Sequence, residues 1–341
     1  MSRLFSVREI ARQAGVSDAT VDRVLHGRGG VRHSTAAQVR QAIKDLEAQG
    51  AQLALSGRRF MIDVVVDAPE RFQREVRKAL ETELPLLAPA VFRARFQLHE
   101  RWNAAACVAE LDRILVRGSQ GVILKAPDVP EISAAVDRLA QAGIPVVTLV
   151  TDLPASRRTA YVGMDNRAAG ATAAYLISQW LGGSPGSVAV TVSNDFFRGE
   201  EEREMGFRGA MRSMAVARRV EYLPGSDGLD ATVRDLLGTL LDTDPSLSAV
   251  YSIGGGNKGI VAAFHAAGRA PAVFIGHDLY PDNIELLRAG RLNAVLHHDF
   301  RYDVRKCCRI IMQAHGALAG HDGTEVSKID VVTRFNIPVG Y

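Results

Sequence analysis

The stretch at residues 6–31, SVREIARQAGVSDATVDRVLHGRGGV, predicts two short helices joined by a tight turn. Ser6 followed by Glu9 has the pattern of a capping box, which starts a helix, and Gly15 can take the positive φ that ends one. Ser17 then has the pattern of a second N-cap. The apolar positions at helical spacing are Val7, Ile10, Ala11 and Ala14 in the first helix and Val21, Val24 and Leu25 in the second. Two helices packed through such a turn form a helix-turn-helix.

The second helix turns its remaining residues outward, namely Asp18, Ala19, Asp22 and Arg23. In a DNA-reading helix, such N-terminal outward residues meet base edges in the major groove. A basic loop at residues 26–32 follows, and a third helix is expected at about residues 34–49. Arg28 and Arg32 in this loop are either phosphate contacts that position the module or ordinary solvated charges. A helical hairpin inside another bundle would show the same spacing, so the spacing leaves both interpretations open.

Charge and composition narrow the class of protein. Residues 1–59 hold ten Lys and Arg against five Asp and Glu, whereas the whole 341-residue chain has a net charge of only +3. This basic start is compatible with a polyanionic partner, but also with a solvated surface. No apolar run reaches the roughly 18 residues of a membrane span, and no signal-peptide core of about 7–15 apolar residues opens the chain. We therefore expect a cytoplasmic protein without a membrane partner.

The three cysteines, Cys107, Cys307 and Cys308, are expected to be small buried side chains in a reducing compartment. They do not have the spacing of zinc ligands. Adjacent side chains of a strand point to opposite faces, so His297, His298 and Asp299 are not expected to converge on a metal. The sequence therefore predicts neither a metal nor a cofactor.

Residues 6–43, SVREIARQAGVSDATVDRVLHGRGGVRHSTAAQVRQAI, resemble the headpiece of the LacI/GalR-type bacterial repressors. The matching positions are Ile10, Ala11, Ala14, Gly15, Val16, Ser17, Thr20, Val21, Arg23, Val24 and Leu25. The resemblance implies base contacts from Asp18, Ala19 and Arg23, and phosphate contacts from Ser17 and Thr20. The expected DNA-binding set is completed by His26, Arg28, Arg32 and Leu55. Asp22 stands where the family commonly has Ser, so it either selects particular bases or points away from the groove.

Residues 50–59 are expected to form the hinge. The family has an Asn-x-x-Ala-x-x-Leu pattern here, which folds into a helix and wedges a Leu into the minor groove. This chain lacks the Asn. Leu55 is the best candidate for the wedge and Leu53 the second, unless the segment is only a linker.

From Phe60 onward, short apolar runs alternate with helical patterns in two rounds, which predicts two lobes, each a doubly wound parallel sheet. The first round starts with a strand at 61–66, and the second is expected to start with a strand at 160–162. The expected domains are a helix-turn-helix at 1–49, the hinge at 50–59, and an effector-binding domain at 60–341. Within the last, the first lobe is expected at about 60–159 and 297–326, and the second at about 160–296 and 327–341.

Ligands of such lobes bind at the carboxyl ends of the strands, where this chain gathers polar and aromatic side chains that suit the hydroxyls and apolar faces of a sugar or polyol. Taken singly, each polar residue could equally form a turn or a helix cap. The candidate effector-binding residues are Phe72, Asp165, Asn166, Phe197, Arg203, Asn257, Asp278 and His298.

The resemblance continues through "IPVVTLVTD", "AYVGMDNRAAGATAAYLI", "RGEEEREMGFRGAM" and "FIGHDLYPDNIELLRAGRLNAVLHHDF", which are similar to the periplasmic-binding-protein-type effector domain of these repressors. It implies that Arg203 and Asp278 contact sugar. His298 stands where a Gln is frequent, and residues 254–257, GGGN, stand where the family usually has Asn-Asp. These departures indicate an unusual effector.

Three other classes remain for comparison. The run at 254–259, GGGNKG, precedes a helix and could cradle a phosphate, which a phosphorylated sugar would supply, but it lacks the Gly-x-Gly-x-x-Gly spacing. A sugar-processing enzyme is disfavoured because the chain has no Gly-x-Ser-x-Gly elbow. A solute-binding protein would need an export signal and no DNA-binding head.

We therefore expect a homodimeric, non-enzymatic transcriptional regulator, most simply a repressor. It is expected to bind a pseudo-palindromic duplex operator under the control of a sugar or polyol.

Overall fold

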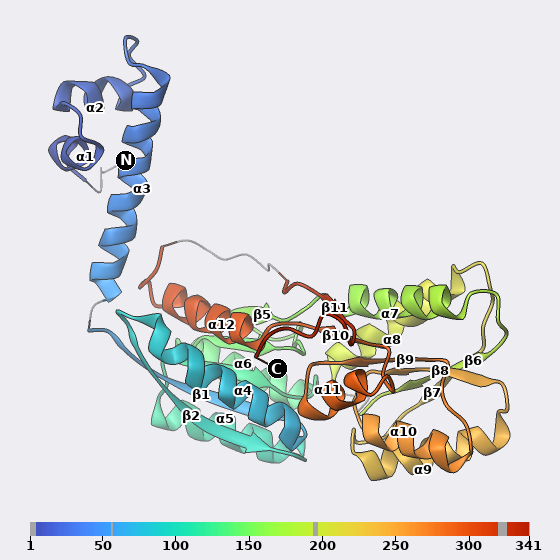
Figure 1. The fold of residues 1–341 in the computed structure, drawn as a ribbon. Coiled ribbons are helices and arrows are strands. Elements are labelled where there is room, and N and C mark those ends of the chain that lie inside the picture. Colours follow the sequence, from blue (N-terminus) through green and yellow to red (C-terminus); the bar gives the residue numbers. More distant parts are fainter. Residues whose placement is uncertain (1–4, 56, 194–196, 320–325, 341) are drawn as a thin grey trace.

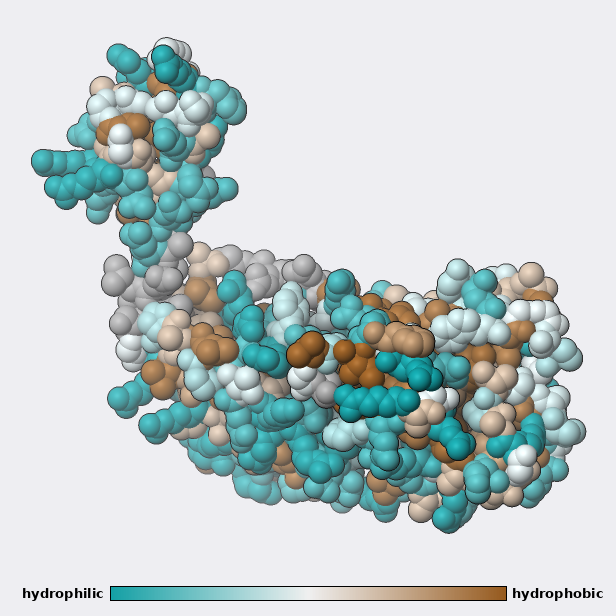
Figure 2. Space-filling view, viewed as in Figure 1, coloured by the Kyte–Doolittle hydropathy of each residue, from teal (hydrophilic) through white to brown (hydrophobic). Residues whose placement is uncertain are grey.

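The computed structural model describes residues 5–55, 57–193, 197–319 and 326–340, without the side chains of residue 48 and residues 51–55. A small helical head stands at the N-terminal end, and one long helix leads from it to a body of two α/β lobes (Figure 1). The surface of the head is largely hydrophilic (Figure 2). This is the two-part architecture that the sequence predicts.

The head consists of α1 (Val7–Ala14), α2 (Asp18–Leu25) and α3 (His33–Leu55). The predicted capping box is confirmed, since the Ser6 and Glu9 side chains each accept the other's backbone N–H. Gly15 ends α1 with a φ of 65°. The core of the head is formed by Ile10, Ala11, Val21 and Val39. The third helix is longer than expected. It continues past Gln49 and ends at Leu55, within the segment predicted as the hinge.

The first sheet has the order β2-β1-β3-β4-β5, and all its strands are parallel. Its strands are β1 (Arg59–Asp67), β2 (Val91–His99), β3 (Gly121–Lys125), β4 (Val146–Leu149) and β5 (Ala160–Val162). One face is covered by α4 (Glu70–Glu83), the 3-10 turn η1 (Leu84–Leu87) and α12 (Phe300–Ala314), and the other by α5 (Ala104–Arg117) and α6 (Pro130–Gln141). Coverage of both faces explains why the central strands β1, β3 and β4 are mostly apolar.

The second sheet has the order β11-β10-β9-β8-β6-β7. Its strands are β6 (Ser187–Thr191), β7 (Val220–Leu223), β8 (Leu247–Ser252), β9 (Val273–His277), β10 (Ala294–His297) and β11 (Asp330–Val332). One face is covered by α7 (Asn166–Leu181) and α8 (Arg198–Arg212), and the other by α9 (Asp230–Thr243), α10 (Asn257–Ala266) and α11 (Pro281–Arg288).

Two details of the sheets differ from the prediction. Strand β5, expected to open the second lobe, pairs with β4 and forms the edge of the first sheet. The boundary predicted at residue 160 is therefore wrong, and the chain first passes to the second lobe after β5. In addition, β11 is antiparallel to β10, so the second sheet is not wholly parallel.

The chain passes between the lobes again after β10 and once more before β11. The first and third passages lie side by side, because Met164 and Ser327 form an isolated β-bridge and the Ser327 N–H donates to the Gly163 carbonyl at 2.8 Å. The lobes are therefore joined by segments that contact each other through their backbones. A rotation of one lobe against the other would change the backbone angles of these segments.

Helices α7 and α8 touch almost backbone to backbone. A Cβ on Gly170 would lie 1.9 Å from the Arg203 carbonyl oxygen, and a Cβ on Gly206 would lie 2.2 Å from the Arg167 carbonyl oxygen. No side chain fits at such distances, so glycine at these two positions is what allows the helices to approach. This contact fixes the backbone from which Arg203 projects.

We predict that Gly206→Ala forces α7 and α8 apart and lowers the free energy of unfolding by about 1–3 kcal/mol, the usual cost of overpacking. Gly209→Ala is the matched control, because Gly209 lies in the same helix with nothing within 4 Å of its added Cβ. That change should stabilise the helix by up to about 1 kcal/mol. Urea denaturation of both variants checks the prediction, and equal effects would contradict it.

Candidate ligand pocket and DNA-binding face

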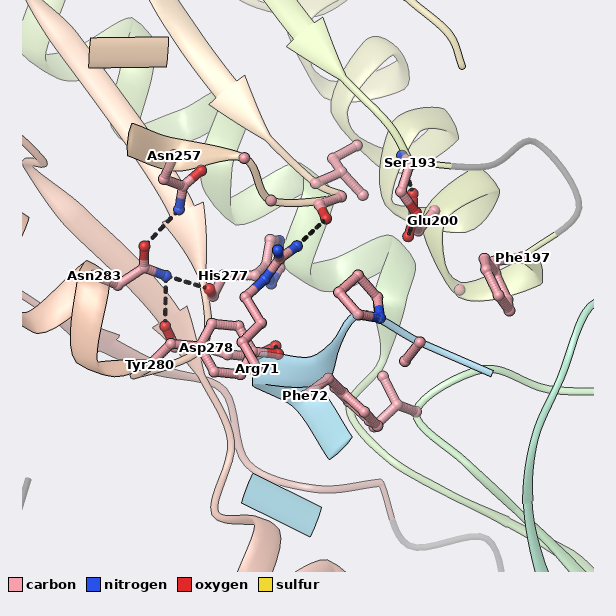
Figure 3. Close-up of a pocket in the computed structure, with 18 of the residues that line it drawn as sticks. Arg71, Phe72, Ser193, Phe197, Glu200, Asn257, His277, Asp278, Tyr280 and Asn283 are labelled. Atoms are coloured by element: carbon pink, nitrogen blue, oxygen red, sulfur yellow. Dashed lines mark hydrogen bonds between the residues drawn. The ribbon is translucent and has the colours of Figure 1, made fainter. Parts of the chain in front are cut away.

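A pocket lies between the lobes, where the carboxyl ends of strands from both sheets face each other (Figure 3). It encloses about 860 Å³, including its open mouth. The loops after β1, β3 and β4 form one wall, and those after β6, β8 and β9 form the other. Its polar and aromatic lining comprises Arg71, Phe72, Lys125, Thr151, Ser193, Phe197, Glu200, Arg203, Asp230, Asn257, Lys258, His277, Asp278, Tyr280, Asp282 and Asn283.

Lys125, the last residue of β3, is a buried cation in this lining. Its Nζ donates to the Asp67 carbonyl at 3.1 Å. It also lies 3.8 Å from the Phe197 ring centre and 5.2 Å from that of Phe72, within cation–π range. Burial lowers the pKa of Lys125 to about 8, although the nearby carboxylate of Glu200 opposes the shift.

Arg203 enters the pocket from α8 and is 4% exposed. Its Nε donates to Asn166 Oδ1 at 2.8 Å, and Asn166 Nδ2 donates to the Tyr161 hydroxyl at 3.1 Å. Within the described chain, Arg203 Nη2 has no hydrogen-bond partner. The guanidinium is therefore held in place by one nitrogen and keeps another available to a ligand.

The opposite wall offers acceptors. Asp278 follows β9 with a φ of 64°, an uncommon conformation for a residue other than glycine. Its Oδ2 accepts from the Tyr280 hydroxyl at 3.0 Å. Asn257 Nδ2 donates to Asn283 Oδ1 at 2.6 Å, and Asn283 Nδ2 donates to the carbonyls of His277 and Asp278 (Figure 3). Among the described residues, Asp278 Oδ1 and Asn257 Oδ1 lack a hydrogen-bond partner.

The two walls are already in contact. Arg71 Nη2 on α4 donates to the Gly254 carbonyl at 3.0 Å (Figure 3), and Arg101 forms a 2.8 Å ion pair with Asp227. A Cβ on Gly255 would lie 2.1 Å from Arg71 Nη2. The glycines at 254–256, before α10, therefore leave room for the Arg71 side chain from the other lobe. They also line the pocket.

His298 lies behind Asp278 and is fully buried. Its Nδ1 is hydrogen-bonded to Asp303, which also accepts from the Ser327 hydroxyl, and its Nε2 lies 3.5 Å from Asp278 Oδ1. Burial lowers the pKa of His298, but the charge and hydrogen bond of Asp303 outweigh it, so the pKa is raised. By contrast, burial and the neighbouring Arg203 lower the pKa of His277, which stays neutral.

The expected effector residues divide into three groups. Those that line the pocket are Phe72, Phe197, Arg203, Asn257 and Asp278. Asn166 and His298 lie one layer behind, where they support Arg203 and Asp278. Asp165, by contrast, does not line the pocket. Its exposed side chain caps α7 by accepting from the Ala168 N–H at 2.9 Å.

The expected effector-binding set omits most of the polar lining, including Arg71 and Lys125. Arg71 precedes the predicted Phe72 by one position, and its role depends on the far lobe. Lys125 ends a strand, which is the signal that could have found it, but a lysine is seldom buried.

Around the histidines, Asp299 caps α12 by accepting from the Arg301 N–H. No group of three or more His, Cys, Asp or Glu side chains among the described residues could hold a metal ion.

In the head, the side chains at the start of α2 are exposed as a DNA-reading face requires. Ser17 caps α2, accepting from the Thr20 N–H at 3.3 Å, and the Ser17 and Thr20 hydroxyls share a 2.8 Å hydrogen bond. The exposed candidates are Asp18, Ala19, Arg23, His26, Arg28 and Arg32. Leu55 ends α3, but its side chain and that of Leu53 lie outside the described part of the chain.

Asp22 has local partners. Its carboxylate forms ion pairs with Arg28 at 3.0 Å and with His26 Nδ1 at 2.9 Å. The acidic residue is thus screened by the basic loop, which agrees with the interpretation that it points away from the bases. The same contacts occupy Arg28 and His26 in this conformation.

Two family descriptions match the chain. Residues 64–317 match the periplasmic binding protein domain, and residues 6–47 match the bacterial regulatory proteins of the lacI family. The body therefore belongs to the periplasmic binding protein domain family. With its lacI-type helix-turn-helix, the protein is a DNA-binding transcriptional regulator of the lacI family, as the sequence predicts.

Solved structures share the fold of the body. The glucose-galactose binding protein GanP of Geobacillus stearothermophilus has a TM-score of 0.73 at 21% identity, covering 83% of this chain and 99% of its own. A protein assigned as a LacI transcriptional regulator of Bacteroides fragilis has a TM-score of 0.72 at 17% identity, covering 82% and 98%. A solute-binding protein of Burkholderia graminis in complex with D-arabinose has a TM-score of 0.71 at 20% identity, covering 84% and 98%.

At these identities the likeness concerns the fold alone. No curated protein sequence is significantly similar to the chain. Within the described residues, the helices lack the combination of length and apolar character that a bilayer span requires.

We predict that His298→Gln removes a pH-dependent contribution to stability. Because the folded-state pKa of His298 is raised above 6.5, its contribution is fully present below that pH and is lost as the pH rises through the folded-state pKa. The difference in unfolding free energy between wild type and variant should therefore shrink as the pH rises from below 6.5 into the alkaline range. Urea titrations across this range measure it, and a constant difference would argue against a charged His298.

Proposed function

We propose that this regulator is a repressor whose operator affinity is controlled by a small sugar or polyol bound between its lobes. The observation that carries the proposal is the mixture of unpartnered groups in the pocket. Arg203 Nη2 offers a donor, and Asp278 Oδ1 and Asn257 Oδ1 offer acceptors. A hydroxyl group donates and accepts at once, and the rings of Phe72 and Phe197 can cover the apolar face of a sugar.

The named ligands of the similar structures support this choice, since GanP is a glucose-galactose binding protein and the Burkholderia graminis protein holds D-arabinose. We infer that the pocket binds its ligand without transforming it, because both matched families are typically non-enzymatic. A sugar sensor without a DNA role would leave the lacI-type head unexplained.

For the head we propose that Asp18, Ala19 and Arg23 contact base edges, and that Ser17, Thr20 and Arg32 contact phosphates. His26 and Arg28 would also contact DNA phosphates, once their ion pairs with Asp22 break. Leu55 would enter the minor groove. A helix-turn-helix reads a half-site, which supports a homodimer on a pseudo-palindromic duplex. A protein that acts on chromosomal DNA belongs in the cytoplasm.

Ligand specificity is tested by thermal shift of the full chain against neutral sugars, polyols, sugar acids and sugar phosphates. Asp278→Asn should weaken the stabilising ligand by about tenfold to a hundredfold, because it removes a charged acceptor. Asp235→Asn, at an exposed position of α9, is the control and should bind like wild type. If no compound of these classes stabilises the protein, the sugar proposal is withdrawn.

DNA reading is tested with Arg23→Ala. An operator is first selected from genomic fragments, and fluorescence anisotropy then compares it with a scrambled duplex. Loss of one base contact should reduce the discrimination by about 1–3 kcal/mol. Arg40→Ala, at an exposed arginine of α3, should lower affinity for both duplexes equally or not at all. Discrimination unchanged by Arg23→Ala would rule out its base contact.

A further inference from the structure

We propose that the effector is an anionic hydroxylated molecule, a sugar acid or a phosphorylated sugar, whose charged group binds between Lys125 and Arg203. This inference rests on the proposed function and specifies the chemical class of its ligand. The groups that contact each charged side chain of the lining support this choice. The cations and the carboxylates differ in these partners.

Three cations of the lining have no carboxylate within ion-pair distance among the described residues, namely Arg71, Lys125 and Arg203. Arg71 is engaged by a neutral carbonyl, that of Gly254. Among the described residues, Lys125 likewise contacts the carbonyl of Asp67 and two aromatic rings, all of them uncharged groups. An ammonium has three N–H donors, so two of them stay available for a ligand.

The carboxylates of the lining, by contrast, already have donors. Both oxygens of Glu200 accept from Ser193, from its N–H at 2.7 Å and its hydroxyl at 2.5 Å. The remaining pairs are Asp230 with the Gly259 N–H, Asp278 with the Tyr280 hydroxyl, and Asp282 with Lys258. Among the described residues, each of these carboxylates therefore has at least one internal donor, whereas Arg71, Lys125 and Arg203 have no carboxylate at ion-pair distance.

A buried lysine without a counter-ion is costly. Burial lowers the pKa of Lys125 to about 8, and the neighbouring Arg203 adds to the shift, although the carboxylates of Glu200, Asp67 and Asp278 oppose it. A bound carboxylate or phosphate would offset it by restoring a negative partner to both cations. A neutral sugar would cover both cations without bringing a carboxylate or phosphate to ion-pair distance, which no described residue supplies.

The remaining unpartnered groups require hydroxyls in the same ligand. Asp278 Oδ1 and Asn257 Oδ1 can only accept, and they belong to the wall formed by the ends of β9 and the start of α10. An inorganic anion would leave both acceptors unsatisfied. A polyol that carries one acidic group satisfies the cations and the acceptors together.

The test is isothermal titration of the full chain with matched pairs, such as gluconate or glucose 6-phosphate against glucitol and glucose. We expect the acidic member of the productive pair to bind about tenfold to a hundredfold more tightly, as charge-assisted hydrogen bonds imply. Binding of the carboxylates alone or of the phosphates alone identifies the acidic group, and either result supports the proposal.

Lys125→Met should remove this preference while leaving the unliganded protein at least as stable, because it removes an unpaired buried charge. Lys78→Met, at an exposed lysine of α4, is the control and should retain the preference. In the wild type, affinity for the acidic ligand should fall as the pH rises through about 8, and this fall should be absent in Lys125→Met. The charged groups facing Lys125 are Asp67, Glu200, Arg203 and Asp278.

A neutral sugar that binds as tightly as its acidic counterpart, with no loss in Lys125→Met, would overturn this inference and leave the proposed function standing. Absence of binding by every acidic and neutral compound would overturn the proposed function itself, and the inference with it.

Discussion

Everything that the body can bind depends on two sheets presenting their carboxyl-terminal edges to each other. Strand-end loops from both lobes then converge, and no side chain has to reach far to line the pocket. The position of Arg203 adds a second constraint, since Gly170 and Gly206 allow α7 and α8 to meet backbone to backbone. The key cation is thus placed by a helix contact rather than by a flexible loop.

The pocket wall and the passages between the lobes share one buried polar network. Asp278 faces the ligand space and approaches His298, whose ring is bonded to Asp303, which in turn binds Ser327. His298 follows β10 and Ser327 precedes β11, so both lie on segments that join the lobes. A ligand hydroxyl that donates to Asp278 Oδ1, the oxygen that His298 Nε2 approaches, would compete with this contact. The network therefore links a ligand-facing residue to the segments that join the lobes.

The sequence was most informative where local chemistry decides the structure. Ser6, Glu9, Gly15 and Ser17 cap the first two helices as their residue types predict, and Phe72, Phe197, Arg203 and Asp278 line the pocket because strand ends and their following helices were recognised. Local patterns failed where distant partners decide. The three residues of β5 do not encode which sheet they join, and Asp165 has the same pattern whether it caps a helix or binds a ligand. Helix α3 continues past Gln49, where its end is expected, and Arg71 gains its role from Gly254 in the other lobe.

The central claim is that occupancy of the pocket changes the affinity of the head for DNA. The direct measurement is operator affinity of the full chain with and without a saturating concentration of the compound that most stabilises it. The account predicts a change of about tenfold or more, matched by an equal change in ligand affinity when operator is present, because coupling between two sites is reciprocal. A ligand that binds tightly in the pocket and leaves operator affinity unaltered would contradict it.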